Sequence, residues 1–133
     1  GRAWLWREGN HDREARPRTA NAATRLPGAV VGDMRLGALR LTHEPEPRSP
    51  ADNRHGEVAG HLHPAARVVA YGRGVRRPCF VTDGSRLILP AFGAFTGGLN
   101  ARDPVVADLF AAEPLAAALG RDRVHALAWD RLL

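Results

Sequence analysis

Short apolar or alternating segments separated by turn residues run along most of the chain, and this pattern predicts β-strands rather than long helices. We expect strands over residues 4–8, 39–44, 57–59, 67–71, 75–82, 86–90 and 124–129. Apolar residues also alternate from Ala29 to Leu41, where Gly32-Asp33 and Gly37 are typical turn residues, so a hairpin is predicted there. The dipeptide Asp83-Gly84 between two apolar runs predicts a second hairpin.

One helix is expected in the C-terminal third of the chain. It would begin at Asp103-Pro104, because aspartate favours the N-cap position and proline favours the first turn. Its apolar face would carry Val105, Val106, Leu109 and Phe110. Pro114 interrupts this pattern, and residues 115–119 are predicted as a second short helical turn that ends at Gly120.

A glycine-rich loop over residues 90–100 follows the predicted sheet and contains Phe92 and Phe95. Such a loop can shape a pocket at the end of a sheet or let the backbone approach a site. The favoured interpretation is that both phenylalanines pack into the core, because buried aromatic side chains mostly serve packing.

The composition permits a phosphate-bearing partner. The chain of 133 residues has a net charge of +5, and all 19 of its basic residues are arginines. Arginine suits phosphate recognition, although a GC-rich coding sequence explains the same bias. No apolar run approaches the roughly 20 residues that span a bilayer, and the single cysteine, Cys79, argues against disulfides. We therefore expect a cytoplasmic protein with no membrane contact, in which Cys79 is a small core residue.

Candidate metal ligands lie where three predicted strands end. The segment Gly60-His61-Leu62-His63-Pro64 places two histidines at alternate positions, so in extended backbone both side chains point to the same side. A second strand runs into Gly9-Asn10-His11-Asp12, and a third ends at His43. Imidazole is a good ligand for Mn, Fe and Zn. An isolated pair of alternating histidines is more often structural, so the convergence of three strand ends carries the metal interpretation.

These motifs, in this order, resemble part of the signature of the calcineurin-like metallophosphoesterases. That signature consists of D-x-H, G-D-x-x-D, G-N-H-D/E, a single histidine at a strand end, and G-H-x-H. The chain carries the last three as Gly9-Asn10-His11-Asp12, His43 and Gly60-His61-Leu62-His63, and it lacks the first two.

Two longer runs, residues 77–84 and 87–100, are similar to the ligase-associated DNA damage response endonucleases of bacteria, as are His43-Glu44-Pro45 and residues 56–64. The resemblance implies an α/β fold, namely the C-terminal portion of a four-layer metallophosphoesterase sandwich that is mainly mixed β-sheet with few helices. Residues 1–133 would be the C-terminal part of one such domain. Without the remaining part, a sheet edge or face would be exposed.

The same resemblance implies two divalent ions in the full-length enzyme, most often Mn, with Fe or Zn possible. Asn10, His43 and His61 would hold one ion and His63 the other, so this chain holds at most one complete site. His11 would contact the scissile phosphate or protonate the leaving oxygen, and Asp12 would orient His11.

The implied activity is a Mn-dependent DNA endonuclease in bacterial repair, with single-stranded DNA as substrate and a functional link to an ATP-dependent DNA ligase. The chain alone is expected to be inactive, because three ligands are missing. Two alternatives stay open: a nucleotide phosphatase or phosphodiesterase with the same metals, and a non-catalytic remnant that binds at most one ion.

Overall fold

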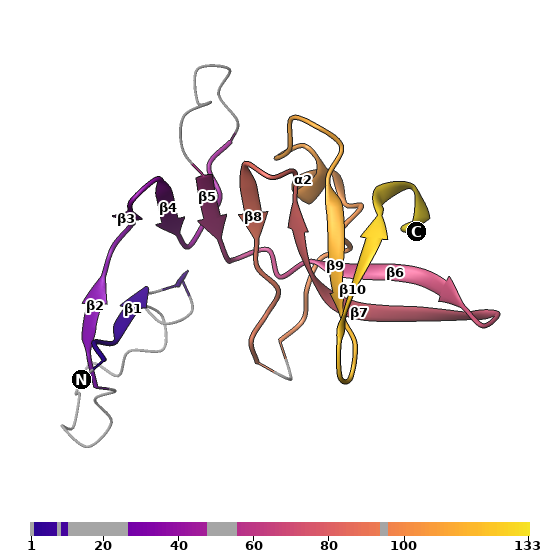
Figure 1. The fold of residues 1–133 in the computed structure, drawn as a ribbon, viewed down its shortest axis with the longest axis horizontal. Coiled ribbons are helices and arrows are strands. Elements are labelled where there is room, and N and C mark those ends of the chain that lie inside the picture. The colour runs from indigo at the N-terminus through magenta and orange to yellow at the C-terminus, as the bar shows by residue number, and fades with distance from the viewer. Residues whose placement is uncertain (1, 8, 11–26, 48–55, 94–95) are drawn as a thin grey trace.

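The computed structural model describes residues 2–7, 9–10, 27–47, 56–93 and 96–133 (Figure 1). The described part is a mixed β-sheet structure with very few helices, which confirms the predicted fold class. Its strands are β1 (Leu5–Arg7), β2 (Ala29–Val31), β3 (Met34–Leu36), β4 (Leu39–Thr42), β5 (Gly56–Ala59), β6 (Ala65–Ala70), β7 (Arg73–Thr82), β8 (Arg86–Ile88), β9 (Leu115–Leu119) and β10 (Val124–Ala128).

The described strands form one large sheet and one small one. In the large sheet the order is β10-β9-β7-β8-β5-β4-β3, and β6 pairs with the first half of β7. Strands β4, β5 and β8 are parallel neighbours, whereas the other pairs are antiparallel. Strands β1 and β2 pair in parallel as the small sheet. Figure 1 shows the small sheet at one end of the molecule and the long β6–β7 hairpin projecting from the other.

The segment from Ala29 to Leu41 is only partly the hairpin that its alternation predicts. The turn at Gly37, with φ 60°, joins β3 to β4 in antiparallel register as expected. Strand β2, however, pairs with β1, and the chain passes from the small sheet to the large one at Gly32-Asp33. Asp33 therefore lies at the junction of the two sheets.

The helical turn predicted over residues 115–119 is wrong, because this segment forms strand β9 between β7 and β10. Ala116 and Ala118 lie opposite Val81 and Cys79, and all four residues are buried. Small side chains allow the two strands to pack closely against the rest of the core, and this packing overrides the helix propensity of alanine.

The predicted helix start at Asp103-Pro104 is confirmed, although the helix is short. Helix α2 covers Pro104–Ala107, and the Asp103 side chain accepts a hydrogen bond from the N–H of Val105. A 3-10 helix, η2 (Trp129–Arg131), follows β10. Within the described residues, none of the helices is long and apolar enough to cross a membrane.

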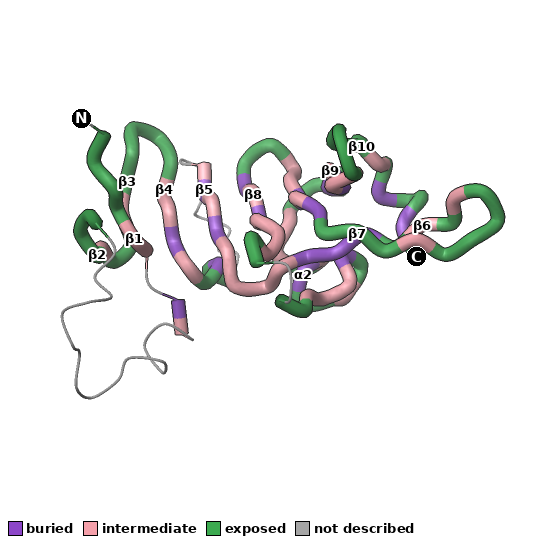
Figure 2. Tube along the Cα trace, turned by 90° about the horizontal axis from the view of Figure 1, so that it is seen from below, coloured by how far each residue is buried: buried purple, intermediate pink, exposed green. Residues whose placement is uncertain are grey.

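The main core lies around the centre of β7. It consists of Ala66, Cys79, Val81, Ala101, Val106, Ala116, Ala118, Trp129 and Leu132, and Figure 2 shows the buried positions concentrated along β7 and its neighbours. Cys79 is a buried core residue, as predicted, and burial raises the pKa of its thiol to about 11. Phe92 is not in the core as expected but fully exposed, because α2 and η2 supply the large side chains there. Phe95 lies outside the described residues.

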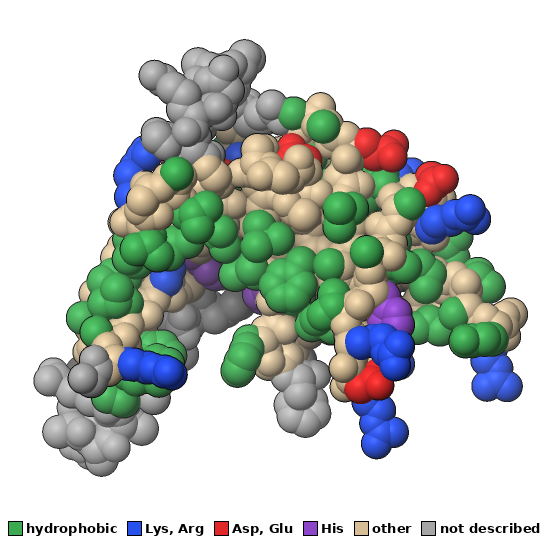
Figure 3. Space-filling view, viewed as in Figure 1, with side chains coloured by type: hydrophobic (Ala, Val, Ile, Leu, Met, Phe, Trp, Pro, Cys, Tyr) green, Lys and Arg blue, Asp and Glu red, His purple; other side chains and the backbone are tan. Residues whose placement is uncertain are grey.

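Large apolar side chains are exposed on the strands near the small sheet. They include Trp4, Leu5, Val30, Leu36 and Leu39, which are between 43% and 63% exposed. Figure 3 shows hydrophobic side chains spread over the visible face. The amount of exposed apolar surface on β1–β4 agrees with the expectation of an uncovered sheet edge or face.

Candidate metal centre

His43 and His61 come from the carboxyl ends of two neighbouring parallel strands. His43 directly follows β4, and Gly60-His61 directly follows β5. The Gly60 N–H donates a 3.0 Å hydrogen bond to the His43 carbonyl, which extends the ladder beyond the last paired residues. Ligands of open α/β sheets commonly bind outside the carboxyl ends of parallel strands. The two histidines lie at such strand ends, and their role as metal ligands stays a prediction.

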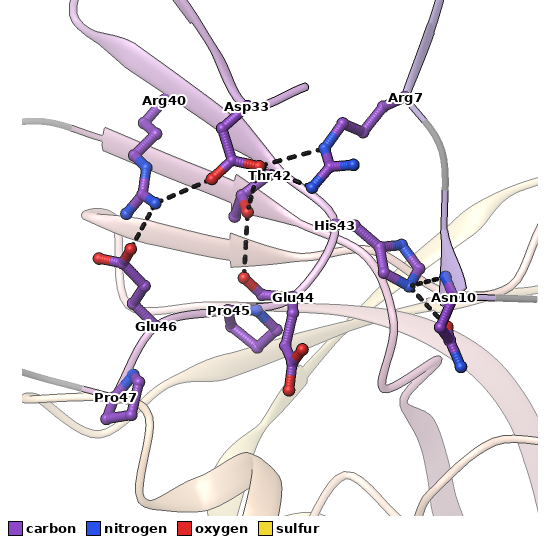
Figure 4. Close-up of a pocket in the computed structure, with 10 residues that line it drawn as sticks. All are labelled: Arg7, Asn10, Asp33, Arg40, Thr42, His43, Glu44, Pro45, Glu46 and Pro47. Carbon is purple, nitrogen blue, oxygen red and sulfur yellow. Dashed lines mark hydrogen bonds and ion pairs between the residues drawn. The ribbon is translucent and has the colours of Figure 1, made fainter. Parts of the chain in front are cut away.

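Asn10 reaches the same point from the small sheet, three residues after β1. Its Oδ1 lies 2.9 Å from Nε2 of His43, and its backbone N–H donates a longer, 3.4 Å hydrogen bond to the same nitrogen. Figure 4 shows the two side chains facing each other. The structure thus joins two motifs that are 33 residues apart in the chain.

Gly9 explains why a glycine precedes Asn10. A Cβ atom built on Gly9 would lie 2.7 Å from Cε1 and 3.1 Å from Nε2 of His43. Carbon atoms in a real core do not approach so closely, so a side chain at this position would displace the imidazole. Gly9 therefore allows the backbone before Asn10 to pack directly against the His43 ring.

Three donor atoms converge at this point in a geometry that fits a metal ion. His61 Nδ1 lies 3.2 Å from His43 Nε2, and the two rings meet edge to face with an interplanar angle of 72°. Two donors bonded to one ion at about 2.1 Å and at right angles would lie about 3 Å apart. The separations of 2.9 Å and 3.2 Å from Nε2 are close to this value.

The contacts of His43 Nε2 depend on whether this nitrogen carries a proton. If Nε2 carries a proton, it can donate to Asn10 Oδ1, but it then cannot accept from the Asn10 N–H. If Nε2 is unprotonated, its lone pair faces the lone pairs of Asn10 Oδ1. A divalent cation between these atoms would turn both lone pairs into favourable contacts.

The electrostatic surroundings favour neutral His43. Partial burial is the main cause that lowers the pKa of His43. Electrostatic interactions with His61, Arg7 and His63 lower this pKa further, whereas the interaction with Glu44 raises it. A neutral imidazole is the form that binds metal. The lowered pKa therefore favours the neutral form of His43 that metal binding requires.

The backbone of the histidine pair differs from the extended conformation predicted for it. His61 has φ 61° and His63 has φ 48°, so both lie in the left-handed region that residues with a Cβ rarely adopt. The hydrogen bond from Leu62 N–H to the Gly60 carbonyl turns the chain tightly here. Such conformations persist where surrounding contacts require them and are concentrated at functional sites.

His63 is close enough to influence the pKa of His43, but it is not part of the cluster of three donor atoms. Its carbonyl packs against Gly98, where an added Cβ would lie 1.9 Å from the oxygen. The predicted catalytic residues His11 and Asp12 lie outside the described residues. Among the residues described, no three His, Cys, Asp or Glu side chains are arranged to hold a metal, so the third donor at this centre is the Asn10 amide.

A network of ion pairs borders the candidate centre and was missed from the sequence. Asp33 Oδ1 accepts hydrogen bonds from Arg7 (Nη2, 2.7 Å) and from the Thr42 hydroxyl (3.0 Å), while its Oδ2 accepts one from Arg40 at 3.0 Å. Arg40 also pairs with Glu46. Together with Asn10 and His43, this network lines a pocket of about 350 Å³. Figure 4 shows the side chains that line it.

Asp33 connects the elements that carry Asn10 and His43. Arg7 ends β1, three residues before Asn10, and Thr42 ends β4, one residue before His43. Burial opposes ionisation of Asp33, but the hydrogen bonds from Arg7, Arg40 and Thr42 outweigh it and lower its pKa. One feature of the sequence could have indicated this network: Arg40 and Thr42 are two residues apart on β4, so their polar side chains share one face of the strand.

The fold of the chain is similar to that of a solved nuclease. The chain is similar to the crystal structure of the Pseudomonas putida nuclease MPE, with 33% sequence identity and a TM-score of 0.60. The match covers 92% of this chain and 53% of the other, so the chain spans about half the length of that nuclease. No protein-family model and no curated protein matches the chain. The described fold is therefore nuclease-like.

Proposed function

We propose that this chain is the C-terminal part of a metal-dependent phosphodiester hydrolase that acts on nucleic acid. The observation that carries the proposal is the convergence of Asn10 Oδ1, His43 Nε2 and His61 Nδ1 from two sheets. The similarity to a solved nuclease over most of this chain supports the same class of substrate.

Asn10, His43 and His61 would hold one divalent ion, and His63 would contribute to a second. A bound divalent ion supplies Lewis acidity and lowers the pKa of a bound water. The chain's own contribution is to fix these donors: Gly9 leaves room for the His43 ring, and the strand ends orient both imidazoles. His11 would act on the leaving oxygen as a general acid, with Asp12 orienting it, as the motif resemblance implies.

The more specific parts of the proposal are supported by the motif resemblance alone. They are Mn as the ion, single-stranded DNA as the substrate, a repair role beside an ATP-dependent DNA ligase, and a cytoplasmic location. The chain lacks the D-x-H and G-D-x-x-D motifs, so we expect it to be inactive by itself.

The test is Mn²⁺-dependent hydrolysis of bis(p-nitrophenyl) phosphate by this chain and by a version extended upstream through the two missing motifs. Each protein is compared with its His63→Ala variant. Activity only in the extended protein, abolished by the substitution, is the expected result. Absence of activity from both proteins would contradict the catalytic proposal and leave a non-catalytic module. Competition between single-stranded DNA and a cyclic nucleotide then separates a nuclease from a nucleotide phosphodiesterase.

A further inference from the structure

The β6–β7 hairpin carries an unbalanced positive charge. Residues 65–78 contain four arginines and no acidic residue, and all four are exposed. Within the part of the chain that the structure describes, none of the four forms an ion pair with a carboxylate. The arginines are Arg67, Arg73, Arg76 and Arg77.

The strand register places two of these charges directly opposite each other. Arg67 pairs with Arg76, and Val69 pairs with Gly74 on the same face of the hairpin. All four positions are exposed, whereas Ala66 and Val68 on the other face pack at the main core. Like charges at directly opposed positions destabilise a pair of strands. An anionic ligand bound between Arg67 and Arg76 would remove this repulsion.

An aromatic side chain stands at the tip of the hairpin. Tyr71 and Gly72 form the two-residue turn between Ala70 and Arg73, and both have positive φ, 52° and 71°. The Tyr71 side chain is fully exposed, although tyrosine is an unfavourable residue for left-handed backbone. Aromatic side chains beside arginines are the usual means of binding single-stranded nucleic acid, through base stacking and phosphate contacts.

The base of the hairpin adjoins the candidate metal centre. Strand β6 begins at Ala65, two residues after His63. The Arg76 guanidinium donates a 2.6 Å hydrogen bond to the Gly98 carbonyl, and Gly98 packs against the His63 backbone. Arg67 is the third residue of β6, so it follows His63 closely along the chain. The face of the hairpin that carries Arg67 and Arg76 therefore begins beside the candidate metal centre and extends away from it.

We propose that the outer face of the β6–β7 hairpin, formed by Arg67, Arg76 and the tip residue Tyr71, binds single-stranded nucleic acid next to the metal centre. The arginines contact phosphates and Tyr71 stacks on a base. This inference rests on the proposed function, because it supplies the contacts that would distinguish a polymeric substrate from a small phosphodiester. Figure 1 shows the tip of the hairpin projecting at one end of the molecule.

The first test measures binding without metal or catalysis. Fluorescence anisotropy of a labelled single-stranded oligothymidylate is followed in EDTA as salt is increased, with this chain and with its Arg67→Ala/Arg76→Ala variant. We expect the variant to bind about tenfold more weakly at low salt and its log–log salt slope to fall by about 1.4, because each phosphate contact on a single strand contributes about 0.7. The control is Arg121→Ala/Arg123→Ala, which removes the same charge from the β9–β10 turn and should leave the slope unchanged.

The second test uses Tyr71→Asn, because asparagine tolerates left-handed backbone better than tyrosine and the hairpin should fold at least as well. We expect affinity for the oligothymidylate to fall at least fivefold with no change in salt slope, since stacking releases no counterions. Circular dichroism confirms that each variant retains its strands.

Equal binding by the chain and the Arg67→Ala/Arg76→Ala variant would overturn the inference, as would an equal loss in the Arg121→Ala/Arg123→Ala control. Binding to anionic phospholipid vesicles but not to the oligothymidylate would also overturn it. These outcomes are separate from the proposed function, because hydrolysis of bis(p-nitrophenyl) phosphate by the extended protein requires no contact with the hairpin.

Discussion

Asn10 Oδ1 lies 2.9 Å from His43 Nε2, although Asn10 follows a strand of the small sheet and His43 follows a strand of the large one. The contact closes the junction between the two sheets at the point where His61 also arrives. The affinity for a ligand held by these three side chains should therefore depend on how the two sheets are placed relative to each other.

Gly9→Ala should weaken metal binding while leaving most of the fold intact. The new methyl group would lie 2.7 Å from Cε1 of His43 and force the ring away from Asn10. Displacing a ligand through a neighbouring residue typically lowers metal affinity by 10-fold to 100-fold, and we expect a loss of about 10-fold or more. The measurement is titration of the chain with Co²⁺, followed by its visible absorption.

Gly32→Ala is the matched control for this substitution, because no atom lies within 4 Å of a Cβ built there. It should bind Co²⁺ like the unmodified chain. If Gly9→Ala and Gly32→Ala bind Co²⁺ equally well, the cluster of Asn10, His43 and His61 is not where the metal binds.

Asp33→Ala should loosen the junction of the two sheets. It removes the carboxylate that Arg7 and Arg40 share and leaves two guanidinium groups close together. Because Asp33 is partly exposed, the expected loss of stability is only about 1 kcal/mol. The larger effect should be on Co²⁺ affinity. Arg7 ends β1 three residues before Asn10, so a movement of β1 would also move the Asn10 ligand.

Urea unfolding and Co²⁺ titration of the same Asp33→Ala sample separate the two effects. Asp130→Ala in η2 serves as the control for loss of an exposed carboxylate. An Asp33→Ala protein with unchanged Co²⁺ affinity would show that the ion-pair network does not position the ligands.

The sequence could predict where the strands that carry the candidate ligands end, because the residues that stop these strands are adjacent to the ligands. Glycine before Asn10 and before His61, and a histidine directly after the alternating segment that forms β4, all mark points where strands stop. Parallel neighbours then bring His43 and His61 together without further information.

The features that the sequence analysis predicted wrongly or missed depend on contacts between distant residues. Residues 115–119 have helical propensity, but Ala116 and Ala118 are drawn into β9 by buried partners on β7. The role of Asp33 depends on Arg7, 26 residues away, and on a junction of sheets that no local pattern encodes. The left-handed backbone of His61 was also missed, because it goes with a turn that the Gly60 N–H anchors to the carbonyl of the distant His43.

Asp83 should make the stability of the chain depend on pH in the acid range. Burial opposes its ionisation, but hydrogen bonds from the Ser85 side chain and from the N–H groups of Ser85, Arg86 and Ala111 outweigh this and lower its pKa to about 2. Its ordinary value is 3.8, so the contribution is complete above pH 3.8 and is lost as the pH falls toward about 2. The shift corresponds to at most about 2 kcal/mol.

Urea unfolding of the chain and of Asp83→Asn, measured across this pH range, tests the prediction. The difference in unfolding free energy should be greatest near neutral pH and shrink toward zero at the acid end. A difference that stays constant with pH would assign the effect of the substitution to packing at the β7–β8 turn instead of to the carboxylate charge.

Arg86 and Glu57 should behave as a buried pair whose members depend on each other. They lie opposite each other on β8 and β5, and each side chain is only 10% exposed. Glu57 also accepts a hydrogen bond from the Glu46 N–H, and Arg86 donates one to the Leu109 carbonyl. Arg86→Met would leave the Glu57 charge buried without its partner, which typically costs about 3–5 kcal/mol.

The double variant Glu57→Gln/Arg86→Met should cost less than Arg86→Met alone, because no unpaired charge then remains in the interior. Urea unfolding of both single variants and the double variant at one pH gives the coupling energy directly. Strictly additive losses would mean that water reaches the pair and screens it, so that the two side chains contribute independently. A strong coupling would instead show that the two buried side chains stabilise the fold as a pair.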